Sequence, residues 1–82
     1  MKLTDNEMKL AQYFIEREGD GILDTIRNID FVESGIIDSL DMVSLAVFIE
    51  KNFGIKLNLT DPETFKNMRR FDSLMTLTGV QP

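Results

Sequence analysis

The sequence contains no cysteine and no histidine. It therefore has no disulfide framework, no zinc site of the usual ligand types, no thiol nucleophile and no imidazole base. These absences remove the usual machinery of hydrolases and metalloenzymes. With 82 residues the chain is also too short to form a cleft between two domains. We expect one domain over residues 1–82 that has no catalytic residues and no metal site.

Positive charge is scarce, because nine basic residues stand against fourteen acidic ones and give a net charge of −5. The chain as a whole therefore repels nucleic-acid phosphates and anionic lipid surfaces. Long hydrophobic runs are absent too, and the segment from Met1 to Glu7 lacks the apolar stretch of a signal peptide. We expect a monomeric cytoplasmic protein that neither binds nucleic acid nor inserts into a membrane.

The acidic residues are concentrated in the first part of the chain. Between Asp5 and Glu50, eleven acidic and three basic residues give a local charge of −8, whereas Lys51 to Pro82 carries +2. An acidic surface favours a partner with a basic docking surface, because complementary potentials steer encounter. The alternative is an acidic surface that only keeps the domain solvated.

Start and stop signals divide the chain into four helices. Thr4 and Glu7 have the spacing of a capping box at the start of the first helix. Asp38 is the predicted N-cap of the strongest helix, which Gly54 ends. Pro62 suits the first position of a short third helix. The predicted helices cover residues 5–18, 39–53, 62–66 and 68–78.

Two connections carry hydrophobic residues and are expected to pack against the helices. Residues 19–37 are too apolar to be disordered, and we expect an ordered loop with one helical turn at Ile22 to Arg27. Residues 55–59 alternate between apolar and polar side chains, but no second alternating run exists to pair with them. We therefore predict an extended connector and an all-α fold.

Asn67 is the predicted N-cap of the last helix. Arg69 and Arg70 would then lie in its first turn, where cations oppose the helix dipole. The pair could form a patch for a dedicated partner, or it could be an ordinary solvated pair.

The helix over residues 39–53 carries two apolar stripes at helical spacing. The larger stripe is expected to face the core and comprises Met42, Leu45, Ala46, Ile49 and Phe53. The second stripe flanks Ser39 on the accessible side and comprises Leu40, Val43 and Val47. A small bundle that buries this helix on both sides is the alternative.

Ser39 is not a conventional nucleophile, because no histidine is present to take its proton. Another enzyme can still modify its hydroxyl, since the flexible Ser34 and Gly35 precede it. A phosphate attached there would lie beside the unpaired amides and the positive end of the helix dipole. Ser39 could also be only an N-terminal helix residue.

The segment Gly35-Ile36-Ile37-Asp38-Ser39-Leu40-Asp41, with Phe53-Gly54-Ile55 after the helix, resembles the phosphopantetheine attachment region of acyl carrier proteins and thiolation domains. Asp-Ser-Leu is the hallmark of that family. The resemblance extends over nearly the whole chain, in the family's order of helices and loops. It implies a four-helix bundle in which Ser39 carries 4′-phosphopantetheine.

The resemblance also implies how the protein works. A phosphopantetheinyl transferase attaches the group to Ser39 from coenzyme A, and the terminal thiol then holds an acyl or aminoacyl group as a thioester. A loading ligase and downstream transferases or synthases are the further partners. The implied docking surface comprises Asp38, Leu40, Asp41, Val43 and Val47.

Some positions depart from many fatty-acid carriers. Two residues separate Gly35 from Asp38, and Ser44, Phe48 and Lys51 stand where further acidic residues would be expected. The chain looks closer to specialised stand-alone carriers, such as those of D-alanine transfer or secondary metabolism. Two other readings stay open, namely a small acidic adaptor that uses the second stripe without a cofactor and a fragment of a larger synthase.

Overall fold

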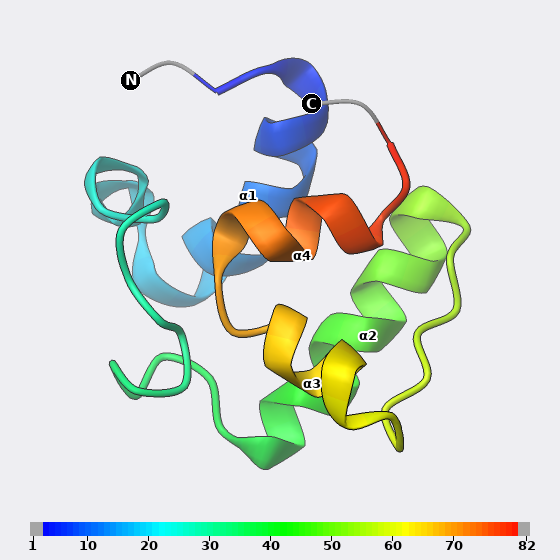
Figure 1. The fold of residues 1–82 in the computed structure, drawn as a ribbon. Helices are drawn as coiled ribbons and strands as arrows, with labels where there is room; N and C mark the ends of the chain where they lie inside the picture. Colours follow the sequence, from blue (N-terminus) through cyan, green and yellow to red (C-terminus); the bar gives the residue numbers. More distant parts are fainter. Residues whose placement is uncertain (1–2, 81–82) are drawn as a thin grey trace.

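The computed structural model describes residues 3–80, which form a helical bundle (Figure 1). Its elements in chain order are α1 (Asp5–Glu18), the 3₁₀ helix η1 (Asp20–Asp24), α2 (Ser39–Phe53), α3 (Pro62–Asn67) and α4 (Phe71–Leu77). No strand occurs within the described residues, so the predicted all-α four-helix fold is confirmed. In the same range, no helix has the length and apolar character needed to cross a membrane.

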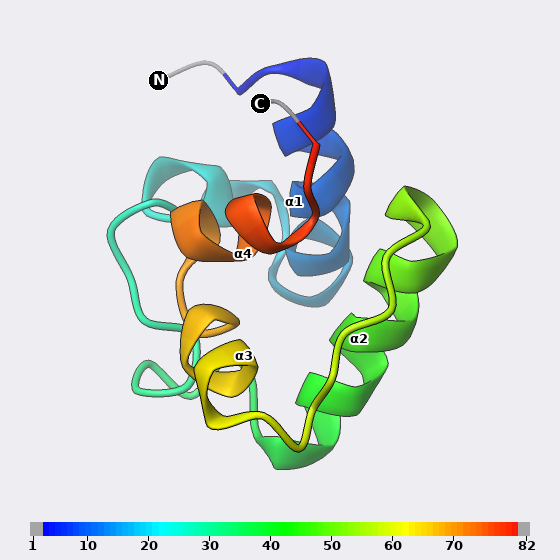
Figure 2. The ribbon, with the colours of Figure 1, turned by 45° about the vertical axis from the view of Figure 1, so that its right-hand side comes forward.

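Capping bonds begin α1 where the sequence predicts. The Thr4 hydroxyl accepts from the Glu7 amide at 3.2 Å, and the Glu7 carboxylate accepts from the Thr4 amide at 2.9 Å. At the C-terminal end of α2, Gly54 adopts a left-handed conformation with φ of 73°, and its amide donates to the carbonyl of Glu50 at 3.0 Å. The predicted bounds of both helices are confirmed. In Figures 1 and 2, α1 runs downward and α2 upward, so the start of α2 lies opposite the start of α1.

The connection from α1 to α2 is ordered and packs into the core, as expected. Its helical turn is η1, which begins at Asp20 and so lies two residues earlier than the predicted start at Ile22. The reason is the first 3₁₀ bond, which runs from the Ile22 amide to the carbonyl of Gly19 at 3.2 Å. The buried side chains of the connection are Ile22, Ile26, Phe31 and Ile37.

The connector from α2 to α3 is extended and runs beside α2 (Figures 1 and 2). Ile55, Leu57 and Leu59 are half-buried and pack against the core. Lys56 and Asn58 between them are exposed. The alternation therefore marks an inward-facing connector without a sheet partner, as predicted.

The prediction that Asn67 caps a helix over residues 68–78 is wrong. Asn67 is the last residue of α3, and α4 begins only at Phe71. The carbonyls that a longer helix would use already have other partners. Ser73 Oγ donates to the carbonyl of Asn67 at 2.8 Å, and the Phe31 amide donates to that of Arg69 at 2.7 Å. Tertiary contacts therefore delay the start of α4.

As a result, Arg69 and Arg70 precede α4 instead of lying in its first turn. Arg69 Nε forms an ion pair with the carboxylate of Asp30 at 3.0 Å. Arg70 occupies the N-cap position, and its guanidinium donates to the carbonyl of Arg27 at 3.4 Å. Both side chains thus bind the loop between α1 and α2, and neither opposes a helix dipole from within the helix.

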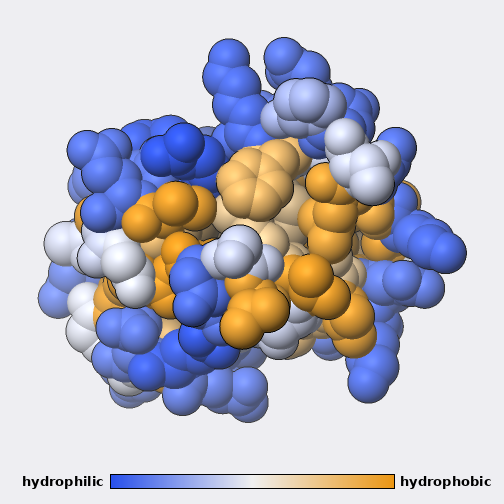
Figure 3. Space-filling view, turned by 90° about the horizontal axis from the view of Figure 1, so that it is seen from below, coloured by the Kyte–Doolittle hydropathy of each residue, from blue (hydrophilic) through white to orange (hydrophobic). Residues whose placement is uncertain are grey.

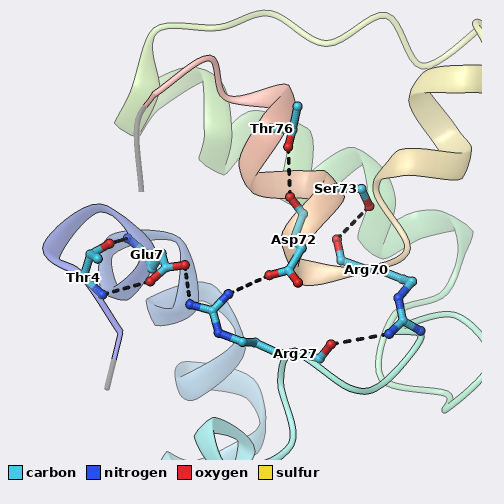
Figure 4. A network of polar contacts seen from close by, with 7 residues as sticks. All are labelled: Thr4, Glu7, Arg27, Arg70, Asp72, Ser73 and Thr76. Atoms are coloured by element: carbon cyan, nitrogen blue, oxygen red, sulfur yellow. Dashed lines mark hydrogen bonds and ion pairs between the residues drawn. The ribbon is translucent and has the colours of Figure 1, made fainter. Parts of the chain in front are cut away.

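Arg27 joins three segments of the bundle (Figure 4). Its guanidinium forms ion pairs with Glu7 of α1 and with Asp72 of α4, the latter at 2.6 Å. The same group lies over the ring of Phe71, with its carbon 5.5 Å from the ring centroid. Glu7 is only 5% exposed, so this ion pair compensates a buried charge that would otherwise be costly.

Candidate functional site

Ser39 is the first residue of α2 and lies between two aspartates that cap each other. The Asp38 carboxylate accepts from the Asp41 amide at 2.9 Å, and the Asp41 carboxylate accepts from the Asp38 amide at 3.1 Å. The predicted N-cap role of Asp38 is confirmed. The second half of the capping box was missed, although an acid three residues after an N-cap is its usual sign. These two bonds hold the turn around Ser39.

The loop before Ser39 is anchored at both of its ends. Phe31 and Ile37 are buried, and the Ile37 amide donates to the carbonyl of Phe31 at 3.0 Å. Between them Gly35 has a φ of 83°, a left-handed conformation that favours glycine. Ser39 itself is exposed. The chain therefore presents this hydroxyl to solvent directly after a fixed point in the core.

The first turn of α2 is also tied to α1. Arg17 Nη2 donates to Asp41 Oδ1 at 2.6 Å, and the Tyr13 hydroxyl donates to the main-chain carbonyl of Asp41 at 3.3 Å. The Arg17 guanidinium lies over the Tyr13 ring, 5.4 Å from its centroid. Sequence reasoning missed these contacts, because nothing local in the sequence pairs residues 24 positions apart.

Asp41 is held in its ionised form by these neighbours. The hydrogen bond from the Asp38 amide lowers the pKa of the Asp41 carboxyl, and the positive charge of Arg17 lowers it further. Partial desolvation acts in the opposite direction but is the weaker effect overall. A negative charge therefore lies in the same first turn of α2 as Ser39 under neutral conditions.

The two stripes of α2 face opposite environments. On the core side, Met42, Leu45 and Ile49 are buried, with exposures of 1%, 0% and 0%. On the other side, Leu40, Val43 and Val47 are exposed by 80%, 53% and 47%. The alternative of a helix buried on both sides is therefore wrong. Figure 3 looks onto the end of the molecule where α2 begins, and hydrophobic side chains gather there within a hydrophilic surround.

Phe65 adds a further exposed apolar side chain that the sequence reasoning did not single out. It is 37% exposed and belongs to α3, which lies at the same end of the molecule as the start of α2 (Figures 1 and 2). A lone aromatic in a six-residue helix gives no periodicity from which its exposure could be read. The apolar surface near Ser39 is thus flanked by a second element.

The arrangement at Ser39 suits covalent modification by an external enzyme. The capping bonds occupy the amides of Asp38 and Asp41. By helix geometry, the amides of the first two helical residues have no intrahelical acceptor, so they are available to a phosphate on the hydroxyl. The fifteen-residue helix behind them supplies a favourable dipole. The residues present therefore fit a phosphate-linked group at this position.

Comparison with known proteins agrees with this chemistry. A family model described as the phosphopantetheine attachment site matches residues 9–71. No curated protein and no solved structure matches the chain. Domains of this family are carriers and not catalysts, and a phosphopantetheinyl transferase modifies them with covalently attached 4′-phosphopantetheine. With the match spanning the loop, α2 and α3 together with most of α1, the chain belongs to the phosphopantetheine attachment family of acyl carrier and thiolation domains.

Proposed function

We propose that residues 1–82 form a single acyl carrier domain in which Ser39 is the attachment residue. The observation that carries the proposal is the exposed Ser39 at the start of α2, within the Asp-Ser-Leu sequence and inside the matched residues 9–71. The attached 4′-phosphopantetheine supplies a terminal thiol that holds an acyl or aminoacyl cargo as a thioester. The chain contributes the hydroxyl and the surface that partner enzymes recognise.

The proposed modification requires only one reacting group from this chain, the hydroxyl of Ser39. Its Oγ forms a bond to the β-phosphorus of coenzyme A, and the bond from that phosphorus to the adenosine 3′,5′-bisphosphate portion breaks. The bisphosphate leaves, and the serine proton passes to a base of the transferase. This division of labour is consistent with a chain that has no histidine or cysteine of its own.

The proposed docking surface surrounds Ser39 and comprises Asp38, Leu40, Asp41, Val43 and Val47. Its three apolar members are the most exposed large hydrophobic side chains of the described residues. Side chains that become fully desolvated at the centre of an interface contribute most of its binding energy, whereas charges at the edge mainly guide encounter. We assign Leu40, Val43 and Val47 to the first role and the two aspartates to the second.

The partners we propose are a phosphopantetheinyl transferase, an acyl- or aminoacyl-loading ligase, and downstream transferases or synthases. A tethered cargo reaches several active sites at high effective concentration, which is the use of such a carrier. Fatty-acid, polyketide and specialised aminoacyl pathways share this chemistry. The departures from the fatty-acid pattern in α2 favour a specialised pathway. We also propose that the carrier acts as a cytoplasmic monomer.

Intact-mass measurement tests the proposal. The purified chain is incubated with coenzyme A, Mg²⁺ and a broad-specificity phosphopantetheinyl transferase. We expect a mass increase equal to one phosphopantetheine, and peptide mapping should place it on the peptide that contains Ser39. A chain that gains no mass would instead be the small acidic adaptor that binds through Leu40, Val43 and Val47. A modified peptide that contains Ser34 or Ser44 but not Ser39 would show that another serine is the attachment residue.

A further inference from the structure

The two carboxylates beside Ser39 differ in how they are neutralised. Asp41 has a side chain that is 22% exposed and forms an ion pair with Arg17, whose side chain is 36% exposed. Asp38 is exposed, and no cation of residues 3–80 lies within ion-pair distance of it. A partner that approaches the attachment turn therefore meets the Asp38 carboxylate, which accepts a capping bond but has no cation partner among residues 3–80, and the Asp41 carboxylate, which is already paired with Arg17.

Arg17 is held in place by more than this single ion pair. Its guanidinium lies over the ring of Tyr13, one turn earlier in α1, and Tyr13 in turn donates to the carbonyl of Asp41. The planar group is therefore oriented before any partner arrives, which lowers the entropy cost of keeping it on Asp41. The exposure of both side chains nevertheless leaves the pair accessible from outside.

We propose that Arg17 attenuates the docking surface by competing with partner cations for Asp41. A basic side chain of a partner enzyme must share or displace Arg17 before it gains the full interaction with Asp41. Arg17 thereby acts as a specificity-determining residue. It weakens the binding of partners that dock mainly through a cation on Asp41, relative to partners that dock mainly on the apolar stripe. This inference rests on the proposed function, because it concerns docking for modification of Ser39.

The chain contains a matched control pair. Arg69 and Asp30 also form an exposed ion pair, with side-chain exposures of 38% and 20%, but it joins the loop after η1 to the turn before α4. Replacing either arginine by methionine removes one positive charge and keeps most of the side-chain volume. Arg69→Met therefore reproduces the change in net charge and the loss of an ion pair without touching Asp41.

The experiment measures the KM and kcat of the broad-specificity transferase for each carrier at several salt concentrations. We expect Arg17→Met to lower KM about two- to fivefold at low salt, the range of an exposed ion pair, and to leave kcat unchanged. The KM should also depend more steeply on salt, because an additional unpaired carboxylate is screened. Arg69→Met should leave KM and its salt dependence as in the unsubstituted protein. Arg17→Lys should give an intermediate KM.

Asp41→Asn tests whether the change in KM caused by Arg17→Met depends on the Asp41 carboxylate. In the Arg17→Met background this substitution should raise KM more than it does in the unsubstituted protein. Equal KM values for Arg17→Met and the unsubstituted carrier would overturn the inference, as would an equal fall for Arg69→Met. A KM that rises in Arg17→Met would show that Arg17 positions the turn instead of masking it. Each of these outcomes requires that the carriers are loaded, whereas failure to load the unsubstituted chain would refute the proposed function itself.

Discussion

The main-chain amide of Phe31 donates a 2.7 Å hydrogen bond to the carbonyl of Arg69, so the loop that leads to Ser39 is fastened to the turn before α4. The side chain of Arg69 adds an ion pair to Asp30, next to Phe31. The ring of Phe31 is fully buried and stacks on Phe14, with centroids 4.2 Å apart. The main-chain bond to the turn before α4 and the stacking on α1 therefore set the position of the attachment loop, whereas the exposed ion pair contributes little.

Ser39→Ala is expected to abolish the mass increase without unfolding the domain. The residue is exposed, and the capping bonds of α2 run between Asp38 and Asp41 without its hydroxyl. Alanine is also a good helix former at this position. Intact mass after transferase treatment and circular dichroism on heating measure the two effects. Ser44→Ala is the control, because Ser44 is also an exposed serine of α2 and should leave loading intact. Loading of the Ser39→Ala variant would refute the assignment.

Opposite faces of α2 should respond in opposite ways to substitution. Ile49 is fully buried, so Ile49→Ala should reduce the free energy of unfolding by about 2–4 kcal/mol. Val43 is 53% exposed, so Val43→Lys should change stability little but raise the KM of loading. Denaturant unfolding and transferase kinetics measure both variants. A Val43→Lys variant that unfolds while Ile49→Ala does not would contradict the orientation of the helix.

Two uncrowded glycines, of which only one has a positive φ, isolate the cost of a left-handed backbone conformation. A Cβ atom at Gly54 or at Gly21 would meet no atom within 4 Å, but only Gly54 has a positive φ, of 73°. Gly54→Ala should therefore lower the free energy of unfolding by about 1–2 kcal/mol through backbone strain alone. Gly21→Ala should leave stability unchanged or raise it, because it reduces the entropy of the unfolded chain. Equal losses in the two variants would contradict this account.

Stability should fall in acid, with Glu7 as a main contributor. The hydrogen bond from the Thr4 amide lowers the pKa of Glu7, and Arg27 lowers it further against the effect of burial. A group with a lowered pKa in the folded state stabilises the fold above its unfolded pKa, and this contribution is lost as the pH falls through the folded value. Asp30 and Asp41 also have lowered pKa values, caused first by main-chain amides and then by Arg69 and Arg17.

Urea unfolding at several pH values between 7 and 3 measures this effect. We expect the free energy of unfolding to decline as the pH falls below about 4.5, since the unfolded carboxylates then begin to bind protons. Glu7→Gln should be less stable at pH 7 and should show a flatter pH profile. Glu16→Gln makes the same change in charge at an exposed position of α1 and should keep the slope of the unsubstituted protein. The same slope in Glu7→Gln would rule out Glu7 as a source of the pH dependence.

The sequence alone determined the parts of this protein whose interactions are local. The caps at Thr4 and Asp38 act over three residues, and the left-handed Gly54 ends α2 by a bond over four. The exposed stripe beside Ser39 follows from helical periodicity, because one face of α2 suffices to fill the core of a small bundle. The Asp-Ser-Leu motif around the proposed attachment residue is likewise identified from the sequence without the structure.

Tertiary structure decided what depends on partners far apart in the chain. Arg17 lies 24 residues from Asp41, and Arg69 lies 39 residues from Asp30. Such pairs form only after the backbone has brought them together, and many alternative pairings are equally compatible with the residue types. The same reason explains the late start of α4, since the carbonyl of Arg69 is taken by Phe31 from the other side of the bundle. Only packing could pair Asp41 with Arg17 and leave Asp38 without a cation partner among the described residues.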